Sequence, residues 1–232
     1  MHSEQVLTAS FGELCDATAE AFDEQLKACF QPDERLEFEV RLPAPGPGGR
    51  PPGVLVYISP KAGARWPEAW APMLDAHHLA WVGARESGNE VDVARRVGLA
   101  QLAPAAAARV GPVDAARVFL AGFSGGGRVA SMMLPVYPQR YAGALFICGA
   151  NPLFAVSGEA ARQLAAVPAV FLTGTGDFNL QDTELALATF QQAGVAGARL
   201  VVVDGLDHAL PAPEALDEVL RYLTGGLDGD AP

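Results

Sequence analysis

Six short apolar runs punctuate this sequence and set the strongest limit on its fold. They lie at 54–59, 79–84, 117–122, 144–149, 169–174 and 198–204. Helix-compatible segments, many rich in alanine, separate most of them, at 89–110, 125–134, 159–166 and 182–193. Strands that are apolar on both faces and alternate with helices predict a mostly parallel sheet covered by helices on both sides. The expected fold is therefore α/β, a three-layer α/β/α sandwich.

The residues before these runs are expected to form an extension. Over 10–30, Phe, Leu and Cys recur at helical spacing, and Ser10 with Glu13 fits a capping box at the start. Residues 1–35 are thus predicted to be a helical extension packed on the domain, with a homodimer contact as the alternative. The run RLEFEVRL at 35–42 alternates like a half-buried strand. The main domain is expected over 36–226, and 227–232 as a flexible tail.

Composition excludes several kinds of partner. A chain of 232 residues with 50% hydrophobic content can bury one sizeable core. Its formal net charge of −11 argues against nucleic acid and against an anionic membrane surface, and no apolar stretch is long enough to span a bilayer. The three cysteines, Cys15, Cys29 and Cys148, have no metal-type spacing, and the N-terminus has no secretion signal. These features favour a cytoplasmic, reducing location, with a cysteine-poor periplasmic protein or one trimmed of its secretion signal as the alternative.

The turn after the third apolar run reads GFSGGG, and three motif patterns compete for it. A P-loop pattern would use Gly122 and Gly127, but the lysine and the hydroxyl that bind phosphate and magnesium are missing. A dinucleotide fingerprint beginning at Gly125 lacks the acidic residue expected about twenty positions later. In the G-x-S-x-G pattern, glycines flank Ser124 on a tight strand-to-helix turn. This pattern predicts that Ser124 is a nucleophile and that the Gly125 N–H is an oxyanion donor.

A nucleophilic serine needs a base, and the base needs an acid; for this turn type the chain order is serine, acid, histidine. His208 is the one histidine downstream of Ser124, and it follows the last apolar run. Asp177 directly follows the preceding run, on a glycine turn that would aim its carboxylate at the histidine. Asp204 and Asp207 are the alternatives. The three predicted catalytic residues would meet at the carboxyl edge of the sheet, where active sites in such sheets form.

Further site residues are expected from their positions at the same edge. A second oxyanion donor should come from the loop SPKAGAR after the first apolar run. Since Pro60 has no N–H, the backbone of Lys61 is expected, with Ser59 as the alternative. Candidate substrate-contacting residues flank the triad: Trp66, Phe123, Asn151 and Phe178, together with Trp70, Phe154 and Leu210.

These motifs resemble those of the α/β-hydrolase family over about residues 36–224. The elements that carry the resemblance are GFSGG (122–126), GTGD (174–177) and the loop around His208. The lead-in VDAARVFLAGFSGGG (113–127) is similar to the Asp-x-x-Arg-Val stretch before the serine in polyhydroxybutyrate-depolymerase and feruloyl-esterase type enzymes, and the chain also resembles phospholipase/carboxylesterase-type proteins. One departure concerns Ser59-Pro60, where many relatives carry His-Gly.

The resemblance implies cleavage of a small-molecule carboxylic ester through an acyl-enzyme, without a metal or cofactor. The segment 150–168 is too short for a large cap domain, which favours short acyl chains or exposed esters. Two alternatives remain open: a thioesterase or peptidase with the same triad, and a non-catalytic binding protein of the α/β-hydrolase fold.

Overall fold

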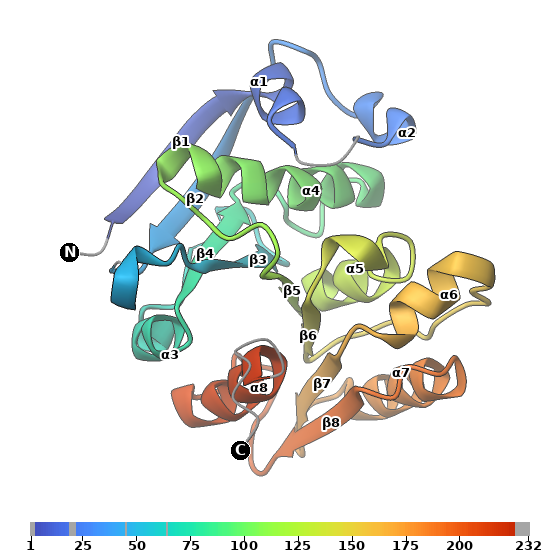
Figure 1. The fold of residues 1–232 in the computed structure, drawn as a ribbon. Helices are drawn as coiled ribbons and strands as arrows, with labels where there is room; N and C mark the ends of the chain where they lie inside the picture. Colours follow the sequence, from blue (N-terminus) through green and yellow to red (C-terminus); the bar gives the residue numbers. More distant parts are fainter. Residues whose placement is uncertain (1–2, 19–21, 45, 64, 226–232) are drawn as a thin grey trace.

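The computed structural model describes residues 3–18, 22–44, 46–63 and 65–225, and its centre is an eight-stranded sheet (Figure 1). The strand order is β1-β2-β4-β3-β5-β6-β7-β8. The strands are β1 (Ser3–Ser10), β2 (Arg35–Leu42), β3 (Gly53–Ile58), β4 (Leu79–Ala84), β5 (Val118–Phe123), β6 (Gly143–Ile147), β7 (Ala169–Gly174) and β8 (Ala198–Val203). β1 and β2 are antiparallel additions, and β3 to β8 pair in parallel. The sheet is mostly parallel, as the sequence predicts.

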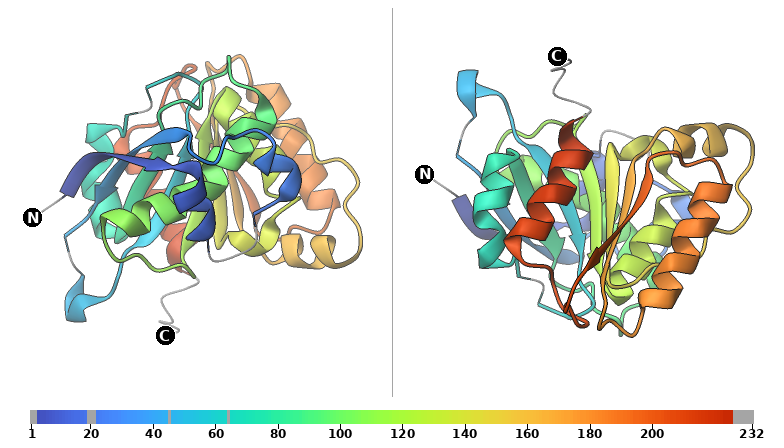
Figure 2. Two further views of the ribbon diagram at one scale, coloured as in Figure 1. Left: turned by 90° about the horizontal axis from the view of Figure 1, so that it is seen from above. Right: turned by 90° about the horizontal axis from the view of Figure 1, so that it is seen from below.

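Helices cover both faces of this sheet (Figure 2). The helices of one face are α1 (Phe11–Asp16), α2 (Glu24–Lys27), α4 (Val93–Val110), α5 (Gly125–Met133), α6 (Gly158–Ala165) and α7 (Leu180–Gln192). The other face is covered by α3 (Ala71–Ala76) and α8 (Pro213–Gly225). The predicted three-layer α/β/α sandwich is confirmed.

Each central strand divides its side chains between two apolar cores. In β3, Val54, Val56 and Ile58 pack into the core under α4, whereas Leu55 and Tyr57 pack into the core under α3 and α8. Every residue of β3 is buried. A strand covered on both sides has no solvent face that needs polar residues, which explains why this run is apolar throughout rather than alternating.

The N-terminal segment differs from its prediction. β1 pairs with β2 along its whole length, from Ser3 opposite Leu42 to Ser10 opposite Arg35. The segment is therefore partly an edge strand of the sheet and not a wholly helical extension. The predicted capping box of Ser10 and Glu13 is confirmed at the start of α1.

The single helix predicted over 10–30 is wrong. Two short helices, α1 and α2, occupy this stretch, and residues 19–21 between them lie outside the described part of the chain. Asp23 caps a new start at α2 by accepting from the N–H of Gln25. The rings of Phe11 and Phe30 stack with centroids 4.7 Å apart. The apolar residues of this stretch lie on separate elements that pack into one cluster. Their spacing in the sequence therefore looks like that of a single helix.

The remaining predictions about organisation have mixed outcomes. The six predicted runs match the strands to within two residues at each end, whereas the sequence pattern does not predict α3 and α8. Among described residues, the connection between β6 and β7 contains α6 and no cap domain. The tail at 227–232 lies outside the described residues, and the boundary at residue 35 stays a prediction.

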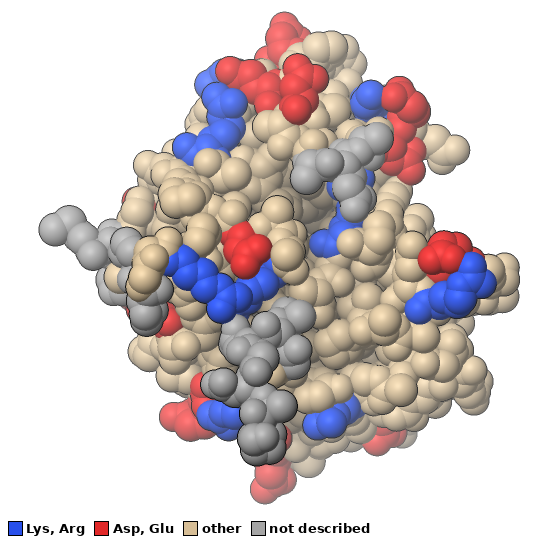
Figure 3. All heavy atoms as spheres, in the orientation of Figure 1, with Lys and Arg blue, Asp and Glu red and all other residues tan. Residues whose placement is uncertain are grey.

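Acidic and basic side chains are interspersed on one face of the molecule (Figure 3). On the face in Figure 3, basic side chains lie mostly beside acidic ones, in small mixed groups. Within the described ranges, no helix has the length and hydropathy that crossing a bilayer requires.

Candidate active site

Ser124 lies on a sharp turn between β5 and α5. Its backbone has φ 54° and ψ −120°, a left-handed conformation that residues other than glycine seldom adopt. The Ser124 N–H donates to the carbonyl of Ile147 at 2.8 Å, which ties the turn to the end of β6. Gly125 begins α5 directly afterwards, so the positive end of the helix dipole lies at the serine.

The glycines after Ser124 allow α5 to pack closely under this turn. A Cβ at Gly126 would lie 1.9 Å from the carbonyl oxygen of Ile58, and one at Gly127 would lie 2.2 Å from the carbonyl oxygen of Gly149. Both are impossible contacts with backbone atoms. Close packing therefore explains Gly127, the last glycine of GFSGGG.

The structure brings Ser124, Asp177 and His208 into one hydrogen-bonded chain. His208 Nε2 lies 2.8 Å from Ser124 Oγ, and His208 Nδ1 lies 2.8 Å from Asp177 Oδ1. The two alternative acids have other neighbours. Asp204 accepts from the Thr175 hydroxyl at 3.3 Å, and Asp207 Oδ1 lies 2.2 Å from the position that a Cβ at Gly176 would take. Of the three candidate acids, Asp177 holds the imidazole.

Asp177 is held as a buried carboxylate. Thr173 Oγ1 donates to its Oδ2 at 2.7 Å, and the Asn179 N–H donates to its Oδ1 at 3.0 Å. Burial raises the pKa of Asp177, but hydrogen bonds from Asn179, Thr173 and His208 outweigh it and hold the pKa below its usual value. The sequence analysis missed both helpers. Their signals were a hydroxyl at the end of an otherwise apolar run, and an Asn two residues after an Asp in a turn.

Asn179 also connects the acid to a second network. Its side-chain amide donates to the carbonyl of Cys148 at 2.9 Å, and its carboxamide oxygen accepts from Arg128 at 3.0 Å. Arg128 donates as well to Asp182 at 2.9 Å and to the Asn151 side chain at 3.1 Å. Asn151 therefore lies in this supporting network, and its expected contact with substrate stays a prediction.

Two phenylalanines lie against the imidazole of His208. The ring centroid of Phe123 is 5.1 Å from that of His208, and the ring of Phe178 is 4.2 Å away. Phe178 is 77% exposed, so its outer face is open to a ligand. Phe154 is exposed on the connection between β6 and β7, and its expected contact with substrate stays a prediction.

The two tryptophans have different places. Trp70 is buried at 1% exposure and donates from its indole N–H to the carbonyl of Pro211, so its expected role as a pocket wall is wrong. Trp66 is half-buried, with the Arg41 guanidinium 4.9 Å from its ring centroid. A cavity lies beside His208. Arg65 lines this cavity, but Trp66 does not.

That cavity is open, measures about 460 Å³ and lies between His208 and the loop after β3. Phe123 and Leu210 line it together with Ser59 and Lys61. The N–H of Lys61, the predicted second oxyanion donor, donates to Ser59 Oγ at 3.0 Å in this structure, and its role as a donor stays a prediction. Among described residues, the Ser59 hydroxyl donates to no acceptor.

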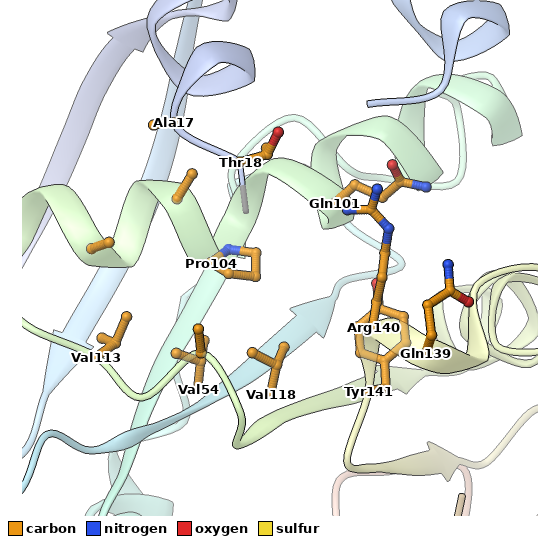
Figure 4. Close-up of a pocket in the computed structure, with 13 residues that line it drawn as sticks. Ala17, Thr18, Val54, Gln101, Pro104, Val113, Val118, Gln139, Arg140 and Tyr141 are labelled. Atoms are coloured by element: carbon orange, nitrogen blue, oxygen red, sulfur yellow. The ribbon is translucent and has the colours of Figure 1, made fainter. Parts of the chain in front are cut away.

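A second cavity, of about 230 Å³, belongs to the opposite edge of the sheet (Figure 4). It is lined by Val54 and Val118, which lie at the starts of β3 and β5, and by Gln101 and Pro104 of α4. Because Ser124 follows the carboxyl end of β5, this cavity is not part of the triad site.

Cys148, Asp177 and His208 are the described group with metal-ligand side chains close together, their donor atoms within 4.8 Å. Both ring nitrogens of His208 are already engaged by Asp177 and Ser124. Burial raises the pKa of the Cys148 thiol to about 12, so it stays protonated. The donor set suits proton transfer better than metal binding.

Comparison with known proteins gives the fold. No protein-family profile and no curated protein sequence matches the chain. Among solved structures, a ferulic acid esterase is similar with TM-score 0.67 and 14% identity, over 97% of this chain and 99% of that one. S-formylglutathione hydrolase from Staphylococcus aureus is similar with TM-score 0.65 and 12% identity, over 97% and 98%.

An acylaminoacyl peptidase from Pyrococcus horikoshii is similar with TM-score 0.66 and 10% identity, over 97% of this chain but 41% of that one. At such identities the likeness is one of architecture, and enzymes that cleave different bonds share it. The chain has the α/β-hydrolase fold.

Proposed function

We propose that this protein is a serine hydrolase that cleaves carboxylic esters through an acyl-enzyme. The observation that carries the proposal is the continuous hydrogen-bonded chain from Ser124 through His208 to Asp177, with both distances at 2.8 Å. The fold supports it, because these residues lie at the carboxyl edge of a parallel sheet, where α/β folds gather their reactive groups.

Each member of the chain has one role. His208 Nε2 takes the proton of Ser124 as Oγ attacks the ester carbon, and then gives it to the departing alcohol. Asp177, kept ionised by its buried hydrogen bonds, holds the Nδ1–H tautomer and stabilises the imidazolium that forms. A water molecule then repeats the sequence on the acyl-enzyme and releases the acid.

Two donors would stabilise the oxyanion. The N–H of Gly125 is the first, at the positive end of α5. The second is the hydroxyl of Ser59, whose oxygen is held by the Lys61 N–H and whose carbonyl is held by the buried guanidinium of Arg96 at 3.1 Å. Lys61 thus acts in the proposal by positioning Ser59 rather than by donating itself.

The open cavity beside His208 favours small substrates. With a volume of about 460 Å³ and no cap in the described residues, it suits short acyl chains or exposed esters better than a long lipid tail.

The test is turnover of p-nitrophenyl butyrate by the wild type and by Ser124→Ala. We expect the variant to fall to the background rate, while circular dichroism stays unchanged. Ser157→Ala is the matched control, because Ser157 is an exposed serine that forms no capping bond. Labelling by a fluorophosphonate should follow the same pattern. Full activity in Ser124→Ala would contradict the proposal.

A thioester is the second candidate substrate. The same triad attacks either bond, and one structure with this fold is that of S-formylglutathione hydrolase. Initial rates on an oxygen ester, a thioester and an amide with the same acyl group separate the three activities. We expect the ester to give the highest kcat/KM, and a thioester preference would reassign the enzyme without changing the triad.

A further inference from the structure

The cavity beside His208 has a charge opposite to that of the protein. The chain carries 27 acidic and 16 basic residues, yet the charged side chains lining this cavity, other than His208, are Lys61 and Arg65. Among the described residues, no carboxylate lines it. An approaching anion therefore meets positive side chains at the reacting centre of a protein with an overall negative charge.

Neither cation is paired with a described carboxylate. Among described residues, Lys61 and Arg65 form no ion pair, and both side chains are exposed to solvent. Lys27, the other lysine of the chain, is paired with Glu24 at 2.6 Å. The contrast matters because paired cations offer little net attraction to a ligand, whereas unpaired ones keep theirs.

An acidic residue near this loop has its own partner. Glu39 accepts from the backbone N–H of Trp66 at 3.4 Å, next along the chain from Arg65. The same carboxylate lies 3.8 Å from Nη1 of Arg85 on the neighbouring segment. The carboxylate of Glu39 is therefore paired with Arg85 and not with Arg65.

The two cations also lie in the same cavity as the triad histidine, His208. Lys61 is two residues from Ser59, and both line a single cavity with His208. Phe123 and Leu210 supply an apolar surface in the same cavity. A complementary ligand would have a reacting ester at the triad, a short apolar portion and an anionic end. A carboxylate matches the forked donors of arginine and the point charge of lysine.

We propose that the natural substrate is an ester or thioester that bears a carboxylate a few bonds from the scissile group, and that Lys61 and Arg65 bind this carboxylate. The inference rests on the proposed hydrolase function and adds the substrate class to it.

Matched esters test the proposal. In the acyl-side arm, mono-(4-nitrophenyl) glutarate is compared with p-nitrophenyl valerate, which has a methyl group in place of the carboxylate. In the alcohol-side arm, 4-acetoxybenzoate is compared with its methyl ester. Each enzymatic rate is corrected for spontaneous hydrolysis. We expect kcat/KM in one arm to be about tenfold higher for the anionic ester, the size expected of two partly screened charge contacts.

The variants then assign this preference to the two side chains. Lys61→Gln with Arg65→Gln should lower the ratio of anionic to neutral kcat/KM about tenfold, and each single variant should lower it less. Lys27→Gln, a lysine-to-glutamine change on α2, should leave the ratio as in the wild type. Raising the salt from about 20 mM to about 500 mM should reduce the wild-type ratio, because exposed charges are screened.

The outcomes separate the two proposals. A wild-type preference for the neutral ester in both arms, or a ratio that the double variant leaves unchanged, would overturn the substrate assignment while Ser124-dependent turnover leaves the hydrolase in place. Absence of Ser124-dependent turnover on all four esters would overturn both.

Discussion

The two halves of the candidate site are built differently. The triad half places Ser124, Asp177 and His208 at the ends of β5, β7 and β8, and Asp177 is fully buried there. The oxyanion half is a loop after β3 in which 61–63 and 65 are exposed. Its second donor depends on Ser59, which is buried at the base of the loop.

The difference lies in what holds each half. Buried hydrogen bonds from Thr173 and Asn179 to Asp177 come from the same strand end and turn. The β3 loop is held instead by distant segments, through Gly63 N–H to the carbonyl of Arg85 at 2.6 Å and Asn89 N–H to the carbonyl of Pro60 at 2.9 Å. Local contacts therefore hold Asp177, the acid of the triad, while the oxyanion loop depends on the segment between β4 and α4.

The largest effect should come from breaking the triad half. Asp177→Asn should lower kcat on p-nitrophenyl butyrate by about 10⁴-fold, because an amide can stabilise the wrong tautomer of His208 and cannot stabilise the imidazolium. Asp204→Asn is the matched control and should change kcat by less than about twofold, the expectation for a residue outside the triad. Equal losses in the two variants would contradict the assignment of Asp177.

The same difference explains what the sequence could predict. The positions of Ser124, Asp177 and His208 were predictable because each follows an apolar run, and parallel strands end at one edge. The sequence indicates Ser59 only as the alternative donor. The hydrogen bond that engages the Lys61 N–H is a matter of side-chain geometry, which no motif encodes.

The strands of the sheet also differ in how well the sequence predicts them. Apolar runs identified the six parallel strands, of which β3 to β7 are almost wholly buried, and the alternation at 35–42 identified the half-buried strand β2. β1 was missed because most of its residues are exposed and its sequence, SEQVLTAS, carries little apolar signal. Its pairing depends on β2, a partner beyond the reach of local periodicity.

Breaking the oxyanion half should have a smaller effect. Ser59→Ala should lower kcat by about 10- to 100-fold with little change in KM, because the hydroxyl would contact the substrate oxygen mainly when it becomes negative. The substitution also releases the Lys61 N–H from its acceptor. An unchanged or increased kcat would therefore identify Lys61 as the donor and contradict the role proposed for Ser59.

The smallest expected effect is on stability. Its dependence on pH distinguishes the ionised Asp177 of the triad half from the uncharged Ser59 of the oxyanion half. The pKa of Asp177 is held below its usual value by the hydrogen bonds to its carboxylate, which outweigh burial. Its contribution to the free energy of unfolding is therefore fully present above the unfolded-state pKa of about 3.9 and is lost as pH falls through the lower folded-state pKa.

Urea unfolding of the wild type, Asp177→Asn and Ser59→Ala at pH 7, 5 and 3 measures this difference. At pH 7, Asp177→Asn should be less stable than the wild type by about 1–3 kcal/mol, the size typical of hydrogen bonds to a charged group. That gap should narrow at pH 3, whereas any gap for Ser59→Ala should not change with pH, because a hydroxyl does not titrate in this range. If the difference in free energy of unfolding between Asp177→Asn and the wild type did not change with pH, the ionised carboxylate would contribute nothing to stability. Packing, and not charge, would then hold the triad half.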